Sequence, residues 1–453
     1  MSELTETDSP QYQPGQLKEI VHSILKEAAE SGASAAEAGI SIESGLNVTV
    51  RMGEVETVEH NRDKGMGVTV YFGKRKGTSS TTDFSPKALE DTVRAACSIA
   101  RYTAEDEFSG LADARLMATD IPDLDLCHPW KLSMDEAVDM ATRCEAAARE
   151  LDARIINSEG ATLSSHQAYR AYANSHGFCG GYASTSHSLS CAVIGQDADG
   201  QGGMQRDYWY DVSRDRSQLD SAESIGQTAA RRTLRRLNGR RIRTMQTPVI
   251  FAADIANGFW GHFISAIRGS SLYRQSSFLL DHLGKQVFSD NIHIQEQPHL
   301  KGAMGSAPFD SEGVATRQRL LVEDGILQGY VLDSYSARKL GMTSTGNAGG
   351  VHNLLIRPGE HDLEGLLKEM DTGLLLTEVM GQGVNIVTGD YSRGATGFWV
   401  EAGEIQYPVE EITVAGNLKE LFMSVAAVGN DVETRSNIRT GSVLVDGMTV
   451  AGE

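Results

Sequence analysis

Residues 35–82 alternate between apolar and polar side chains, and this period-two pattern is the feature that most limits the fold. The pattern occurs in five short stretches separated by Gly, Asn or Asp: AGISIES, LNVTVRM, VETVEHN, MGVTVYF and KGTSSTT. Such alternation is typical of strands that pack one face against a core and expose the other. We therefore expect an antiparallel meander of five short strands in this part of the chain.

Segments with helical spacing flank the meander. Apolar residues recur at helical intervals over residues 17–32 and 85–103. A second unit has the same order, with a helix over 133–153, alternating residues, and a helix over 221–237. Ser133, with a glutamate three residues later, forms a capping-box sequence at the start of the third helix. Both units therefore indicate antiparallel sheet covered by helices.

From about Thr244 onward, strand and turn patterns predominate. Asp324-Gly325 and Ala402-Gly403 lie between apolar runs, which is a signature of tight β-hairpins. Only a few helices interrupt the pattern, and we expect them at 254–268, 333–341, 361–371 and 417–424.

These patterns predict an α+β protein, in which N-terminal units of antiparallel sheet flanked by helices precede a large β-rich C-terminal domain. The chain has 453 residues, which is enough for about two or three domains. The expected organisation is a disordered tail over 1–16, an α+β domain over 17–125, a central α+β segment over 126–243 and the β-rich domain over 244–453.

Charge and cysteine content narrow the range of functions. The formal net charge is −20 at pH 7. This charge argues against nucleic acid or anionic membrane as a partner, although arginines cluster locally over residues 231–243. The five cysteines are widely spaced and form no CxxC pair. With no apolar signal core and no transmembrane-length apolar run, the expected location is the cytoplasm.

The stretch PVIFAADIANGFWGHFISAI (248–267) passes from a short apolar strand into a helical segment with one histidine, His262. A catalytic zinc site needs three protein ligands and a nearby carboxylate. Gly258 occupies the position one turn before His262, where that carboxylate would be needed. Asn257 is five residues away, which places its side chain about 140° around a regular helix. The residues alone favour an ordinary polar position for His262.

A second histidine-containing stretch is HIQEQPH, with His293, Glu296 and His299 at three-residue steps. Pro298 disfavours a helix at this point. On a strand, the two histidines would share one face and the glutamate would lie on the other. This arrangement is a weak candidate for a metal site.

The chain from about residue 17 onward resembles the TldD/PmbA family of metallopeptidases, and within it the TldE type. The resemblance rests on many stretches in the same order, including GEVETVEHN, APFDSEGV, TSTGNAGG, TGDYSRGATGFWVEAGEIQYPVEEITVAGNL and VGNDVETRSNI. TldD-type members of this family hold one metal with an HExxxH helix and a cysteine near the C-terminus.

Matched to that pattern, NGFWGH retains only one of the three HExxxH residues. Asn257 replaces the first histidine and Gly258 replaces the glutamate, whereas His262 matches. Thr440 is expected at the cysteine position, with Asp431 as the alternative placement. The resemblance therefore implies a vestigial metal site at Asn257, Gly258, His262 and Thr440. No metal is expected on this chain, and zinc or a similar divalent ion is expected in a TldD-type partner.

The function that the resemblance implies is that of a non-catalytic subunit in a TldD/TldE-type heterodimer. Such a pair degrades or processes unfolded peptides, including peptide toxins, antitoxins and peptide precursors. Whether the isolated chain forms a homodimer stays open, and the peptide-binding residues are undetermined. One alternative is a peptidase active on its own, in which His262 joins His293 or His299. Another is a regulatory protein, such as a modulator of DNA gyrase.

Extended peptides commonly bind by addition to a sheet edge. The glycine-rich strands around Gly349, Gly350, Gly381 and Gly383 would let a peptide backbone approach closely, although turns explain these glycines more simply.

Overall fold

The computed structural model describes residues 13–197, 200 and 203–452. Most of the tail predicted over 1–16 therefore lies outside the described residues. Its end is wrong, because helix α1 (Pro14–Glu30) begins inside the predicted tail. Pro14 suits the first helical turn, and the Gln16 side chain accepts a hydrogen bond from the backbone N–H of Gln13 at 2.8 Å.

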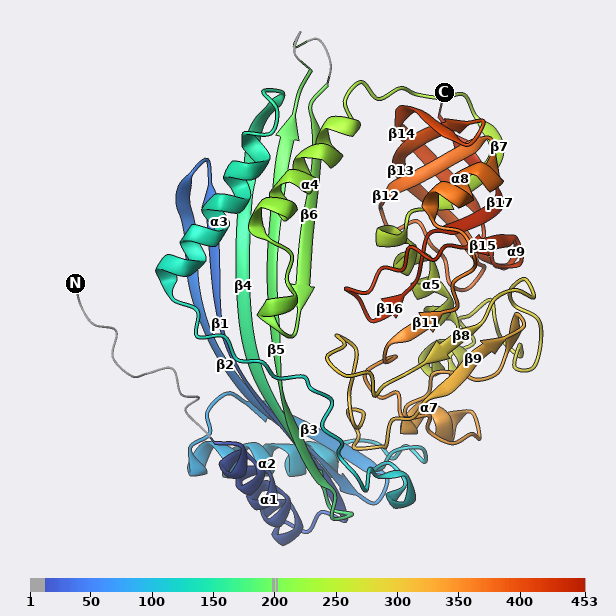
Figure 1. Cartoon of the computed structure of the whole chain (residues 1–453). Helices are drawn as coiled ribbons and strands as arrows, with labels where there is room; N and C mark the ends of the chain where they lie inside the picture. Colours follow the sequence, from blue (N-terminus) through green and yellow to red (C-terminus); the bar gives the residue numbers. More distant parts are fainter. Residues whose placement is uncertain (1–12, 198–199, 201–202, 453) are drawn as a thin grey trace.

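A single antiparallel sheet of six strands joins the two N-terminal units (Figure 1). The strand order is β3-β2-β1-β4-β5-β6, so the first strands of the two units, β1 and β4, pair at its centre. The strands are β1 (Ala35–Arg51), β2 (Glu54–Phe72), β3 (Arg75–Thr81), β4 (Ile155–Asn174), β5 (Cys179–Gly195) and β6 (Gln205–Ser213).

The prediction of five short strands over 35–82 is wrong, because the segment forms three longer strands. β1 continues through Gly45, and β2 continues through Gly65. β1 is paired with β2 on one side and β4 on the other, and the neighbouring ladders keep the chain extended at its glycine. A Cβ at Gly45 would lie 2.3 Å from the His166 ring, so this glycine permits close packing rather than a turn.

The four α-helices among the described residues of the N-terminal half cover the same face of the sheet. Near α1 and α2, β1 contributes Ala38 and Ile40 to the core. Near α3 and α4, it contributes Leu46 and Val48. These residues are all even-numbered, and the strand is regular between them, so their side chains project to one face. The remaining helices of this half are α2 (Pro86–Tyr102), α3 (Met134–Arg149) and α4 (Ala222–Arg235).

The C-terminal half contains a six-stranded sheet that closes on itself. Its order is β14-β13-β12-β7-β17-β15, and β14 also pairs with β17. This additional pairing joins β7, β12, β13, β14 and β17 into a ring around a large hydrophobic core. The strands are β7 (Met245–Phe251), β12 (Gly373–Met380), β13 (Asp390–Glu401), β14 (Glu404–Asn417), β15 (Val425–Val428) and β17 (Val443–Ala451).

A smaller five-stranded sheet of order β10-β9-β8-β11-β16 lies beside the ring (Figure 1). Its strands are β8 (Ile294–Glu296), β9 (Arg319–Glu323), β10 (Ile326–Leu327), β11 (Leu354–Ile356) and β16 (Ile438–Arg439). The helices of this half are α5 (Ala253–Ala266), α6 (Gly269–Tyr273), α7 (Ser334–Lys339), α8 (Leu363–Met370) and α9 (Leu418–Met423).

The predicted fold class is confirmed by this arrangement. Both predicted hairpins form, with β9 and β10 joined at Asp324-Gly325 and β13 and β14 joined at Ala402-Gly403. All four turn residues have positive φ, as a tight hairpin turn requires. The four helices expected in the C-terminal half correspond to α5, α7, α8 and α9.

Side chains of α7 connect the C-terminal half to the loop that follows α2. The Arg338 guanidinium donates hydrogen bonds to the carbonyl oxygens of Phe108, Gly110 and Leu111, at 2.6, 2.7 and 3.0 Å. The hydroxyl of Tyr335 donates to Asp106 at 2.7 Å. These charge-assisted contacts fix the sheet of the N-terminal half relative to the C-terminal loops.

We predict that Gly77→Ala strongly destabilises the protein. A Cβ at Gly77 would lie 2.1 Å from the Ala96 carbonyl oxygen on α2, so β3 and α2 would have to separate. Overpacking of this kind costs about 1–3 kcal/mol. Gly67→Ala is the matched control, because a Cβ there meets nothing within 4 Å. Denaturant unfolding should show a loss of stability for Gly77→Ala only, and equal stabilities of the two variants would contradict the packing argument.

Candidate functional site

Helix α5 begins directly after the central strand β7, and its first turn is held by residues from the C-terminal segment. The backbone N–H of Ala253 donates to the Ser442 hydroxyl oxygen at 3.1 Å. The same hydroxyl donates to Asp431 at 2.6 Å. Asp254, in the first turn, forms a 2.9 Å ion pair with Arg232 of α4. An acidic residue at this end of a helix is favoured by the helix dipole.

His262 lies on α5 with a free imidazole nitrogen. Its Nε2 is buried and has no hydrogen-bond partner among the described residues. The ring packs edge-on against Tyr391 of β13, with the two centroids 5.7 Å apart. Burial, assisted by the nearby Arg393 guanidinium, lowers the pKa of His262 to about 4. The imidazole is therefore neutral at pH 7, which is the form that binds metals.

Asn257 and Gly258 lie on the same helix, one to two turns before His262. A Cβ added at Gly258 would meet nothing within 4 Å. The glycine is therefore not required by close packing, and the helix has room for a longer side chain. Neither residue supplies a carboxylate or an imidazole, so the helix retains one of the two histidines of an HExxxH sequence and lacks its glutamate.

Thr440 follows β16 and lies against α5, although on the side of Trp260. The indole Nε1–H of Trp260 donates to the Thr440 hydroxyl at 2.9 Å, and both side chains are fully buried. Trp260 and His262 lie about 200° apart around the helix. The alternative position, Asp431, is linked to the N-terminus of α5 by Ser442, whose hydroxyl donates to Asp431 and accepts from the backbone N–H of Ala253. Both candidates therefore reach α5 from the C-terminal segment, at different points.

The histidines of HIQEQPH contact residues outside α5 and do not approach His262 as partners. His293 lies 3.4 Å from the Asp324 carboxylate, and His299 lies 2.9 Å from the Thr316 hydroxyl. Glu296 is buried and accepts hydrogen bonds from Arg319 and Asn347, both at 2.8 Å. Within residues 13–197, 200 and 203–452, no group of three or more His, Cys, Asp or Glu side chains is arranged to hold a metal ion.

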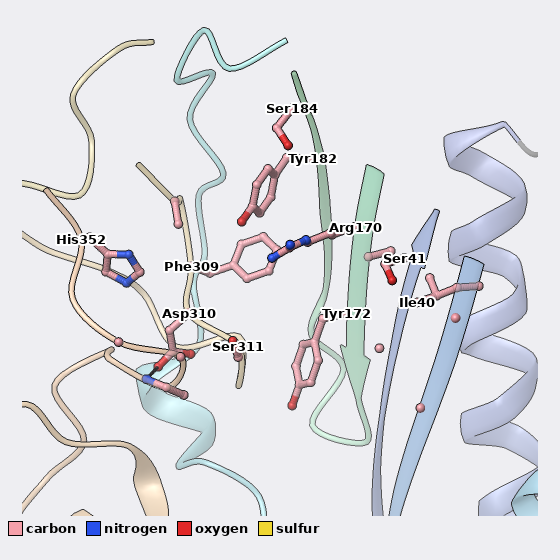
Figure 2. Close-up of a pocket in the computed structure, with 18 of the residues that line it drawn as sticks. Ile40, Ser41, Arg170, Tyr172, Tyr182, Ser184, Phe309, Asp310, Ser311 and His352 are labelled. Atoms are coloured by element: carbon pink, nitrogen blue, oxygen red, sulfur yellow. Dashed lines mark hydrogen bonds between the residues drawn. The ribbon is translucent and has the colours of Figure 1, made fainter. Parts of the chain in front are cut away.

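A cavity of about 1180 Å³ lies between the N-terminal sheet and the C-terminal loops (Figure 2). The sheet contributes residues of β1, β2, β3, β4 and β5, including Arg170 and Tyr172, and loops over 304–311 and 348–352 form the opposite side. Gly349 and Gly350 line it with φ values of +103° and +128°. Gly349 and Gly350 stand out in the sequence, whereas the sheet residues do not, because only strand pairing brings the latter together.

Among the described residues, no helix is long and apolar enough to span a membrane.

We predict that the buried imidazole of His262 makes the fold acid-sensitive. The folded-state pKa of about 4 is below the ordinary value of 6.5, so the unfolded chain binds the proton more tightly. Stability therefore falls as the pH drops from 6.5 through 4, by up to about 3 kcal/mol. His262→Phe keeps an aromatic ring against Tyr391 and should reduce this loss. Identical pH dependence of unfolding in parent and variant would contradict the prediction.

Models of one family match most of the chain. They are the PmbA/TldA metallopeptidase domain 1, central domain and C-terminal domain, over residues 36–100, 127–237 and 244–452. The metalloprotease PmbA of Escherichia coli O157:H7 is 53% identical, and the match covers 96% of each chain. The PmbA homologue of Haemophilus influenzae is 50% identical over 97% of each chain.

Solved structures agree with these matches. A Bacteroides thetaiotaomicron protein named as a candidate modulator of DNA gyrase superposes with a TM-score of 0.91 at 30% identity, over 97% of this chain and 99% of that one. TldE from Thermococcus kodakarensis has a TM-score of 0.83 at 21% identity, over 96% of this chain and the whole of the other, and shows the same fold. The resemblance seen in the sequence is therefore confirmed, and the chain belongs to the PmbA/TldD metallopeptidase family.

Proposed function

We propose that this chain is the non-catalytic subunit of a heterodimeric metallopeptidase in the cytoplasm, paired with a TldD-type chain that holds the metal. The main support is the composition of α5. Of the positions aligned with HExxxH, only His262 supplies a metal ligand, and Gly258 leaves open space where the catalytic carboxylate would be needed. Glycine cannot act as a general base, and asparagine and threonine are poor substitutes for an imidazole and a thiolate on zinc.

The existence of two types of chain within one family supports the pairing. Relatives of this chain include a TldD homologue of Buchnera aphidicola, 24% identical over 83% of this chain, and the TldE structure described above. A chain that keeps the family fold without the catalytic groups would contribute an interface and part of a peptide-binding chamber. The substrates would be unfolded peptides, including toxins, antitoxins and peptide precursors.

Two other functions have less support. A peptidase active on its own would need His262 together with His293 or His299, but each of the latter has a separate partner. A role in modulating DNA gyrase appears in the name of the Bacteroides thetaiotaomicron relative. The net charge of −20 disfavours direct contact with DNA in such a role.

The proposal predicts that peptidase activity requires both chains. An unstructured peptide should be cleaved by an equimolar mixture of this chain and a TldD-type chain, and cleavage should stop when a chelator removes the metal. Size-exclusion chromatography should show a mixed complex. If the TldD-type chain alone cleaves at the full rate of the mixture, this chain is not an obligate subunit.

The vestigial site can be tested by reconstruction. The variant Asn257→His, Gly258→Glu, Thr440→Cys would supply two imidazoles and a thiolate for zinc and a carboxylate as base. Zinc binding by this variant would show that a cysteine at position 440 reaches the His262 side of α5, whereas the purified parent chain should contain well under one zinc per molecule.

The reconstruction also separates the two candidate positions for the lost cysteine. Because Thr440 contacts the Trp260 side of α5, a parallel variant with Asp431→Cys in place of Thr440→Cys is the matched comparison. Zinc titration of both folded variants shows which position completes the site. Negligible binding by both would mean that the residue assignment is wrong.

A further inference from the structure

The cavity between the two halves of the protein has a positive lining, although the protein as a whole is strongly acidic. Its charged lining residues are Arg170, Arg214 and Asp310, with His352 also present. The Asp310 carboxylate accepts hydrogen bonds from the backbone N–H groups of Glu312, Val314 and Ala348, each at 2.9 Å. The backbone N–H groups of the surrounding loops therefore stabilise the Asp310 carboxylate, which does not form an ion pair with either arginine.

Arg170 is the cation that remains available to a ligand. It is exposed, and no carboxylate of the described residues lies within ion-pairing distance of its guanidinium. Figure 2 shows its side chain projecting from β4 into the space beside the loop that bears Phe309 and Asp310. Arg214 is instead held in place, because it donates to the carbonyl oxygens of Thr185 and Met304 at 2.7 and 2.8 Å.

Three glycines form the floor of the cavity next to Arg170. In the sheet, Gly39 is opposite Gly67, and Ser41 is opposite both Gly65 and Arg170. A Cβ at Gly39 or Gly67 would meet nothing within 4 Å, and one at Gly65 would meet only the Ser41 hydroxyl at 4.0 Å. None of the three glycines has a positive φ.

Neither backbone conformation nor internal packing therefore requires these glycines. Glycine within a strand weakens it, and it often marks a place where a ligand or another backbone approaches closely. The result is a half-buried stretch of sheet without side chains, bordered by the cation Arg170 and the aromatic side chain of Tyr172.

We propose that this cavity binds an extended peptide segment that lies across the glycine floor, with a carboxylate of the peptide paired to Arg170. The peptide class rests on the proposed function, whereas the charge and shape of the site do not. The cavity volume of about 1180 Å³ exceeds the roughly 300–1,000 Å³ typical of small-molecule sites, as a segment of several residues would require. Phe309 and Tyr182, whose ring centroids are 5.6 Å apart, provide an apolar wall for its side chains.

The test is fluorescence anisotropy with the purified full chain and labelled, unstructured peptides of Gly, Ser, Ala and Val. One peptide has a free C-terminal carboxylate, a second has a C-terminal amide, and a third has the amide and one internal glutamate. A peptide with a carboxylate should bind about tenfold more tightly than the neutral amide, the usual effect of a charge-assisted hydrogen bond. The third peptide distinguishes a terminal carboxylate from a side-chain carboxylate as the group recognised.

Variants locate the binding. Arg170→Ala should abolish the preference for carboxylate, and Arg170→Lys should retain part of it. Arg231→Ala removes the same charge from the exposed surface of α4 and should change nothing. Gly67→Val should weaken binding of all three peptides without lowering the thermal midpoint, because the added side chain enters open space.

Equal affinities for the three peptides, no saturable binding, or an unchanged preference in Arg170→Ala would overturn the inference. A different result would contradict the proposed function: a mixture of this chain with a TldD-type chain that cleaves peptides no faster than the TldD-type chain alone. Suppose that the mixture cleaves peptides equally well whether it contains the parent chain or Arg170→Ala, and that the two chains also bind peptides with equal affinity. The subunit role would then stand, but this cavity would be rejected as a peptide site.

Discussion

The pairing of β1 with β4 is the interaction on which the N-terminal half depends. Each strand is the first of its own unit along the chain, and a ladder from Glu37–Asn174 to Val50–Ala161 makes the two units one sheet. Side chains alternate across a strand, so the register sends Ile40 and Val48 to the helices and Gly39 and Ser41 to the cavity. A slip of one residue would exchange the two sets. Core and cavity are therefore determined by the same register.

The cavity also depends on how the two halves are held together. Arg338 donates to three backbone carbonyl oxygens of the loop after α2, so a rigid guanidinium fixes that loop to α7. Nearby, burial raises the pKa of Glu312 to about 7, with Ser334 donating its backbone N–H to the carboxylate. A carboxyl group that is partly protonated at neutral pH lies in the loop adjoining the cavity, where a full charge would be costly to bury.

Helix α5 is held in the fold independently of the HExxxH-aligned positions that it carries. The helix is held by its aromatic residues, since Phe259, Trp260 and Phe263 are buried in the C-terminal core. Asn257 and Gly258 lie outside that packing, so changes there have little effect on the core. Thr440 satisfies the Trp260 indole N–H, which would otherwise be buried without a partner. The Thr440 hydroxyl therefore has a packing role in the fold.

The sequence by itself determined the features that depend on neighbouring residues. Ser133 caps a helix, and Asp324-Gly325 turns a hairpin, because these hydrogen bonds and φ angles involve only a few successive residues. It also determined the α+β class and, by resemblance, the family. Only the tertiary structure decided that five short strands are three long ones, that Thr440 meets Trp260, and that Arg170 lies beside a glycine floor. Those outcomes depend on the register between strands and on contacts between segments more than a hundred residues apart, which no local pattern encodes.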